Sequence, residues 1–138
     1  MIWKYPAEDV GLLPPLVLAY IGDAVFELFI RTRLAAETTK VDMLHREVTG
    51  YVNARAMSAY YKKWEPLLTA AETEILRRGR NVKSRQIKSA GVAQYHRSTG
   101  FEALVGYLFL SRQEVRLTQL LTVLLEEPND GTVAYEKE

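Results

Sequence analysis

Hydrophobic residues recur along most of this chain at intervals of three and four positions, the spacing that places side chains on one face of an α-helix. Runs in which apolar and polar residues alternate between turn residues, as they do in β-strands, are missing from the sequence. No internal repeat or low-complexity tract interrupts the pattern. The sequence therefore predicts an all-α protein, a helical bundle formed by one domain.

The first long helix is predicted over residues 14–34, because it begins with two prolines, which are tolerated in a first helical turn. Twelve of residues 16–30 are hydrophobic. A helix that is apolar on all sides lies either at the centre of a bundle or against another subunit. A membrane span is the alternative, but the apolar stretch is shorter than the ~20 residues that a span needs. It also contains Asp23 and Glu27, each of which would cost roughly 3 kcal/mol near the middle of a bilayer.

Other helices are predicted from apolar stripes and from local start signals. Residues 39–63 form either one long helix or two helices in line, with a possible bend at Gly50. Residues 80–98 are expected to be a loop with at most one short helix, because their periodicity is weak. We expect the core to span about residues 14–127 and the tail from Pro128 to fray.

Three further helices are expected to start where a Ser or Thr is followed, three residues later, by Glu. This capping box pairs both side chains with backbone groups that a helix start leaves unpaired. The boxes are Thr69–Glu72, Thr99–Glu102 and Ser111–Glu114.

Composition narrows the class of protein. The chain has 138 residues, of which 48% are hydrophobic and 25% charged, as is usual for globular proteins. It contains no cysteine, which excludes a disulfide framework, a thiol nucleophile and a zinc or iron–sulfur site with cysteine ligands. The N-terminal residues lack the basic region and apolar run of a signal peptide. We therefore expect a cytoplasmic protein.

The net charge of +1 hides a strong segregation of charge along the chain. Residues 75–101 carry seven basic residues and no acidic one, whereas the rest of the chain sums to −6. A solvated face is one explanation, but this density of positive charge favours a polyanionic partner, because Lys and Arg bind phosphates. Tyr95 and His96 lie beside these cations and are weaker candidates for contact with a sugar or base. The basic residues are Arg77, Arg78, Arg80, Lys83, Arg85, Lys88 and Arg97.

Asp23 is the most conspicuous candidate for chemistry, because it interrupts an apolar helix. A buried carboxylate costs several kcal/mol unless a cation, a metal ion or hydrogen bonds compensate it. Glu27 lies one turn further on the same face, and Arg31 lies one turn beyond that as a partner for Glu27. The simpler alternative is a polar stripe in which a Tyr or Arg satisfies Asp23.

Glu102 is the second candidate, at the start of another nearly apolar segment. Its place in a capping box would explain it without any further role. Paired with Asp23 from another helix, however, it would form a site for Mg²⁺, which prefers oxygen ligands and retains several waters. Such an ion would also reduce the repulsion between these carboxylates and a phosphate partner.

Three segments together resemble the ribonuclease III family. The sequence LAYIGDAVFELFIRTRL, centred on Gly22-Asp23-Ala24-Val25, resembles its signature helix. Phe101-Glu102-Ala103-Leu104-Val105-Gly106 is similar to its second conserved block, in which the Glu is a metal ligand. Tyr51-Val52-Asn53 is similar to a Leu-Val-Asn segment between them. The order and spacing agree over roughly residues 14–112.

Two departures from the family pattern point to one branch of it. Ala19 and Thr99 stand where the larger family members carry two more carboxylates. We also expect no double-stranded-RNA-binding domain, as in the compact bacterial branch that consists of the catalytic domain alone. The resemblance implies a homodimeric, Mg²⁺-dependent endoribonuclease that cuts double-stranded RNA and matures the ends of 23S ribosomal RNA. Asp23 would be the catalytic carboxylate and a metal ligand, and Glu102 the other ligand.

The resemblance leaves several alternatives open. One or two Mg²⁺ ions could bind each site, Mn²⁺ could replace them, and a ribosomal protein could present the precursor stem. A rival interpretation is a non-catalytic module that binds double-stranded RNA during ribosome assembly, which would not need a metal ion. A generic helical interaction protein would leave the charge segregation unexplained.

Neutralising Arg77, Arg78 and Arg80 together is predicted to weaken RNA binding and to flatten its dependence on salt. Each phosphate contact that is lost should lower the slope of log K against log salt by roughly 0.9, because fewer counterions are released. Binding titrations at several salt concentrations measure this slope. An unchanged slope would contradict the assignment of these arginines to RNA.

Overall fold

The structure is a computed structural model that describes residues 5–82 and 91–126. Within these two ranges the chain is helical and contains no strand, which confirms the predicted all-α class. None of the helices found there combines the length and the hydropathy needed to cross a membrane. In chain order the elements are η1 (Ala7–Leu12), α1 (Pro15–Ala35), α2 (Val41–Tyr51), α3 (Ala54–Trp64), η2 (Glu65–Leu67), α4 (Ala70–Arg80), α5 (Val92–Leu110) and α6 (Glu114–Glu126).

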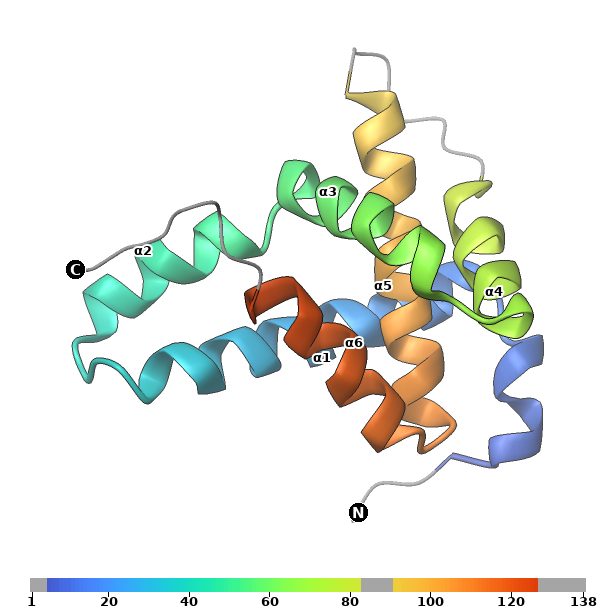
Figure 1. Ribbon diagram of the computed structural model, residues 1–138, viewed down its shortest axis with the longest axis horizontal. Coiled ribbons are helices and arrows are strands. Elements are labelled where there is room, and N and C mark those ends of the chain that lie inside the picture. The colour runs from blue at the N-terminus through green and yellow to red at the C-terminus, as the bar shows by residue number, and fades with distance from the viewer. Residues whose placement is uncertain (1–4, 83–90, 127–138) are drawn as a thin grey trace.

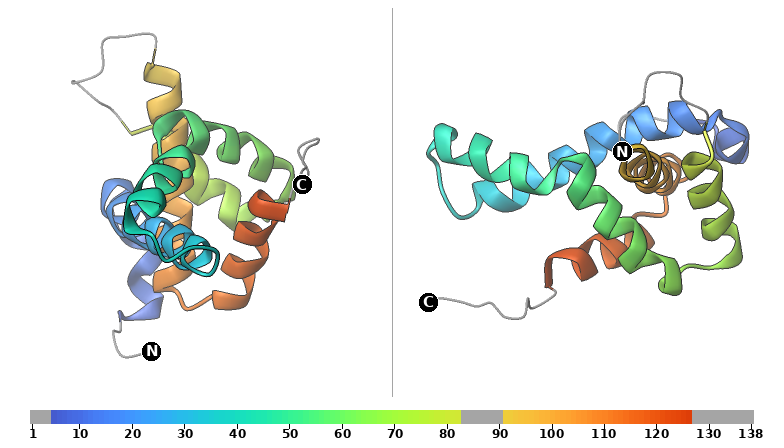
Figure 2. Two further views of the ribbon diagram at one scale, coloured as in Figure 1. Left: turned by 90° about the vertical axis from the view of Figure 1, so that its left-hand side faces the viewer. Right: turned by 90° about the horizontal axis from the view of Figure 1, so that it is seen from above.

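The helix α5 is the centre of the fold, and α1, α3 and α4 pack around it (Figure 1). Viewed nearly along α5, α1 lies on one side of it, whereas α3 and α4 pass along other sides (Figure 2, right). Residues 98–101 and 103–106 of α5 are all buried, because neighbours cover almost every face of the helix. The α2 helix and the C-terminal half of α1 project away from this core (Figure 1).

Glycines allow α1 and α5 to touch backbone to backbone. A Cβ atom added to Gly22 would lie 1.8 Å from the carbonyl oxygen of Glu102, and one added to Gly106 would lie 2.0 Å from the carbonyl oxygen of Leu18. These distances are far below van der Waals contact, so no residue with a side chain fits at either position without moving a helix. Gly22 and Gly106 therefore allow the close approach of α1 and α5.

Four aromatic rings fill the space between α1, α3 and α5. The ring of Phe101, which is fully buried, lies 5.0 Å from Phe26, 5.4 Å from Tyr60 and 4.6 Å from Trp64, measured between ring centroids. The planes of Phe26 and Phe101 are 88° apart, a favoured edge-to-face arrangement. The hydroxyl of Tyr60 donates to the carbonyl of Tyr51, and burial raises the pKa of Tyr60 to about 12. This cluster packs side chains of α1, α3 and α5 together and so stabilises the α1–α5 crossing.

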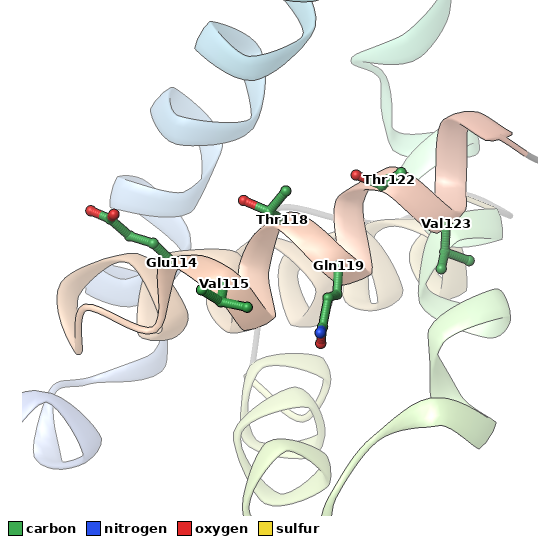
Figure 3. A pocket seen from close by; sticks show the side chains of 6 residues that line it. All are labelled: Glu114, Val115, Thr118, Gln119, Thr122 and Val123. Carbon is green, nitrogen blue, oxygen red and sulfur yellow. The ribbon is translucent and has the colours of Figure 1, made fainter.

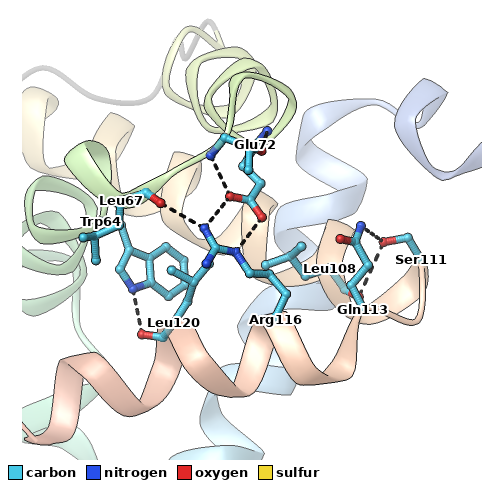
Figure 4. Close-up of polar contacts among 9 residues, drawn as sticks. Trp64, Leu67, Glu72, Leu108, Ser111, Gln113, Arg116 and Leu120 are labelled. Carbon is cyan, nitrogen blue, oxygen red and sulfur yellow. Dashed lines mark hydrogen bonds and ion pairs between the residues drawn. The ribbon is translucent and has the colours of Figure 1, made fainter.

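Polar contacts attach α6 to the rest of the molecule (Figure 4). The guanidinium of Arg116 donates to both carboxylate oxygens of Glu72, at 2.8 and 2.9 Å, and to the carbonyl of Leu67. The indole N–H of Trp64 donates to the carbonyl of Leu120 at 2.9 Å. Because Arg116 hydrogen-bonds the buried Glu72, the pKa of that carboxyl lies below its usual value.

Two of the sequence predictions are confirmed almost residue for residue. The first predicted helix corresponds to α1, which begins at the second proline and ends one residue later than expected. The capping box at Thr69 is formed: the backbone N–H of Glu72 donates to the Thr69 hydroxyl, and the backbone N–H of Thr69 donates to the Glu72 carboxylate.

The prediction for residues 39–63 is wrong in one respect. Two helices form, but they are not in line, and the chain turns after Tyr51 rather than at Gly50, which lies inside α2 (Figure 1). The reason is Asn53, whose side-chain oxygen accepts from the backbone N–H of Ala56 at 2.8 Å and so caps the start of α3.

The other two capping boxes are wrong. Thr99 lies in the middle of α5, which begins at Val92, and its hydroxyl donates to the carbonyl of Tyr95 at 2.9 Å. Ser111 ends α5 instead of starting α6. A Ser or Thr hydroxyl can bond the carbonyl four residues back inside a helix, so the pattern alone does not identify a start. Residues 92–98 are consequently helical, while 83–90 and the tail from Pro128 lie outside the described residues.

Gly106→Ala is predicted to destabilise the protein by about 3 kcal/mol or more, because the added methyl group must push α1 away from α5. Gly50→Ala is the matched control: nothing lies within 4 Å of its added Cβ, so the change should stabilise α2 by about 0.5–1 kcal/mol. Urea unfolding measures both free energies. Similar values for the two variants would contradict the close crossing.

Candidate active site

The α1–α5 crossing brings two carboxylates together. Asp23 follows Gly22, whose Cα lies against the carbonyl of Glu102, so the two acidic residues face each other across the contact. Burial, together with the hydrogen bond and the negative charge of Asp23, raises the pKa of Glu102 to about 8. Such a pair is unfavourable by itself and becomes favourable when a cation binds between its oxygens.

Burial is divided unequally between the two acids. The sequence suggested that Asp23 would need compensation for burial, but its side chain is exposed, whereas Glu102 is partly buried. The group that faces Asp23 is thus a second acid rather than a Tyr or Arg.

No further free carboxylate lies one helical turn from the pair. Ala19 is buried and apolar, and Thr99 is only 3% exposed, with its hydroxyl donating to a backbone carbonyl. Glu27 pairs with Arg31 on the surface of α1, as the sequence predicted. The described residues contain no group of three or more His, Cys, Asp or Glu that could hold a metal ion. Asp23 and Glu102 fit a hard divalent cation that keeps waters as its other ligands.

The three described arginines at the end of α4 have different surroundings. The guanidinium of Arg78 donates to the carbonyls of Gly11 and Leu13, at 2.8 and 3.2 Å, and so ties α4 to the segment before α1. Arg80 donates to the hydroxyl of Tyr61 at 3.2 Å. Arg77 is exposed. Replacing Arg78 would therefore also remove a structural contact. The remaining predicted RNA-binding residues, Lys83, Arg85 and Lys88, lie outside the described residues.

One side of α1 is exposed and apolar. The side chains of Val17, Tyr20 and Leu28 are 42%, 79% and 62% exposed, and those of Leu12 and Leu16 are also exposed near its start. The opposite side of the same helix is buried against α5. The sequence offered a buried centre or a subunit seam as alternatives for this helix, and the structure shows one side buried in the core and one exposed apolar side.

A hollow of about 680 Å³ lies along α6, and neither Asp23 nor Glu102 lines it (Figure 3). All six side chains that line it come from this one helix, and Glu114 is the only acid among them. It brings no catalytic groups together, so the candidate site remains at Asp23 and Glu102.

Comparison with known protein families matches residues 16–113 to the Ribonuclease III domain, a range that contains both carboxylates. The chain belongs to the ribonuclease III family and is an endoribonuclease. Proteins of this family act on double-stranded RNA, generally as dimers, and are generally metal-dependent.

Within the family, the chain is similar to proteins named Mini-ribonuclease 3. It is 50% identical to that of Symbiobacterium thermophilum over 111 residues, covering 79% of this chain and 85% of the relative. It is 45% identical to that of a Thermoanaerobacter species over 121 residues, covering 86% and 85%. The crystal structure of a protein from Fusobacterium nucleatum has the same fold, with a TM-score of 0.77 and 29% identity, over 86% of this chain and 96% of that one.

The carboxylate pair is predicted to destabilise the metal-free protein as the pH rises. The ordinary pKa of Glu102 is 4.5 and its folded-state pKa is about 8, so between these values the folded state holds a proton that the unfolded state has lost. Stability therefore falls with increasing pH across this window. In EDTA, Glu102→Gln should raise the thermal midpoint by roughly 3 °C or more at about pH 9. The difference should nearly vanish at about pH 3.5, where Glu102 is mostly protonated in both states. An equal difference at both pH values would contradict the raised pKa.

Proposed function

We propose that this protein is a Mg²⁺-dependent endoribonuclease that cleaves double-stranded RNA and acts in the maturation of 23S ribosomal RNA ends. The observation that supports it best is the facing pair Asp23 and Glu102 in a member of the ribonuclease III family. Oxygen ligands of this kind suit Mg²⁺, and Mn²⁺ can take its place.

The two carboxylates have different tasks in this proposal. Asp23, which is exposed, holds the ion at the surface where an RNA phosphate can approach. Glu102 must give up its proton to become the second ligand, and a nearby cation favours this loss because it offsets the charge of Asp23. The bound ion supplies positive charge that stabilises the phosphodiester in the transition state and lowers the pKa of water beside it.

The proposed assembly is a homodimer joined through the exposed apolar face of α1. Val17, Tyr20 and Leu28 are exposed on this helix, and the same face of a second copy would cover them from water. A two-fold axis through α1 would place two Asp23–Glu102 sites in one cleft, one for each strand of a duplex.

Binding of the duplex is assigned to the basic segment. A-form RNA is recognised mainly through its shape, its phosphates and its 2′-hydroxyls, so clustered cations are sufficient for contact. Arg77 is the exposed described member, and Arg78 and Arg80 combine a structural contact with their charge. Lys83, Arg85 and Lys88 complete the proposed set. A ribosomal protein that presents the precursor stem is compatible with this arrangement.

Asp23→Asn is expected to lower cleavage of a long RNA duplex by at least about 10²-fold, because the ion loses a charged ligand. RNA binding should remain within a few-fold of the wild type. Glu27→Gln is the matched control, since this acid lies one turn further along α1 and already pairs with Arg31, and its cleavage rate should be nearly unchanged. Cleavage and binding are measured with Mg²⁺ and with EDTA.

The alternative outcome has a clear form. If the wild type binds the duplex equally well in Mg²⁺ and EDTA and cuts it in neither, the proposed reaction is wrong and the protein acts as an RNA-binding module. If Glu27→Gln abolishes cleavage as Asp23→Asn does, the ligand assignment is wrong.

A further inference from the structure

Helix α3 is a second concentration of positive charge, separate from residues 75–101 in the sequence. Its eleven residues, Ala54–Trp64, include Arg55, Lys62 and Lys63 and no acidic residue. The remainder of the chain outside residues 75–101 is strongly acidic, so this helix departs from its sequence context. The net charge of the chain outside residues 75–101 does not reveal these basic residues, because α3 is short and is followed by Glu65.

Arginines from two other helices reach onto α3. The Nε of Arg97, on α5, donates to the hydroxyl of Ser58 at 2.6 Å. A terminal nitrogen of Arg80, at the end of α4, donates to the hydroxyl of Tyr61 at 3.2 Å. Ser58 and Tyr61 are only 5% and 2% exposed, so each guanidinium is held in place by the hydroxyl of a buried residue of α3. Anchoring reduces the side-chain entropy that either arginine would lose on binding an anion.

These contacts assemble one surface from three helices. Arg55 and Lys62 are exposed and lie one turn before and one turn after Ser58, on the same side of α3. Arg80 joins these side chains through its hydrogen bond to Tyr61. We call this surface the α3 basic face, and it consists of Arg55, Lys62, Arg80 and Arg97, of which Arg80 also belongs to the basic segment assigned to the duplex.

The α3 basic face is directed away from the candidate active site. Arg97 and Glu102 are five residues apart on α5, which corresponds to about 140° around the helix. Arg97 contacts α3, whereas Glu102 faces α1, and α1 and α3 lie on different sides of α5 (Figure 2, right). A straight duplex seated on the two carboxylates would therefore leave most of this face uncovered.

The chemistry of the face suits phosphates better than a protein surface. The cores of protein–protein interfaces are rich in apolar and aromatic side chains. The large exposed hydrophobic residues of the described chain lie on other elements, and α3 contributes none of them. Arginine guanidinium groups instead match phosphate oxygens with paired N–H donors.

We propose that the α3 basic face binds the phosphate backbone of a second RNA segment, so that the protein holds two arms of one folded RNA. This inference rests on the proposed function, because it concerns the same RNA substrate. One arm lies at Asp23 and Glu102, and the other lies across α3. The preferred substrate is then a branched RNA rather than an isolated duplex.

The test compares two RNAs in an Asp23→Asn background, in which binding is measured without cleavage. One RNA is a duplex, and the other is a three-way junction that contains the same duplex as one arm. Arg55→Ala with Lys62→Ala removes two exposed cations. The slope of log K against log salt for the junction should fall by about 2, and junction affinity should fall at least several-fold. Affinity for the duplex should be unchanged.

Lys40→Ala with Arg46→Ala is the matched control, because it removes two exposed cations from the projecting α2 region. This pair should leave both RNAs bound as in the parent protein. An unchanged slope for the junction in the α3 variant would overturn the inference, and so would an equal loss of affinity for the isolated duplex. If the parent protein bound neither RNA, the proposed function itself would be wrong, which is a distinct result.

Discussion

The backbone contact between α1 and α5 is the constraint on which the rest of the structure depends. Two helices can approach this closely only where both lack side chains, and Gly22 and Gly106 meet that condition. The contact puts Asp23 beside Glu102, although 79 positions separate them in the sequence. The aromatic cluster around Phe101 then fills the angle between the helices and keeps them in this orientation.

Two glutamates show how the same side chain serves different purposes. Glu72 is buried against Arg116, which hydrogen-bonds both of its oxygens and lowers its pKa, so its charge stabilises the fold. Glu102 is partly buried against another acid, and its pKa is raised to about 8. An unfavourable pair of acids of this kind is characteristic of a site that binds a cation. Glu72, in contrast, already has a cationic partner within the protein.

The sequence was a good guide where a local interaction decides the structure. The helix class, the extent of α1, the box at Thr69 and the Glu27–Arg31 pair are of this kind. It failed at Thr99, because the hydroxyl there has a partner inside its own helix. The pairing of Asp23 with Glu102 was proposed first from the residue types, as one of two alternatives, and then from family resemblance. The exposure of Asp23 and the partial burial of Glu102 could not be predicted, because they depend on how α1 lies on α5. The double role of Arg78 could not be predicted either, because its partners are backbone carbonyls more than 60 positions away.

The two glycines of α5 have a consequence for how the protein can vary. Gly106 meets α1 near the carboxylates, and Gly100 meets Gly79 of α4 within the basic segment. The two contacts are six residues apart, about 9 Å along one rigid helix. Changes that loosen one contact need not disturb the other. The affinity for RNA and the rate of cleavage can therefore change separately during evolution, through substitutions around different turns of α5.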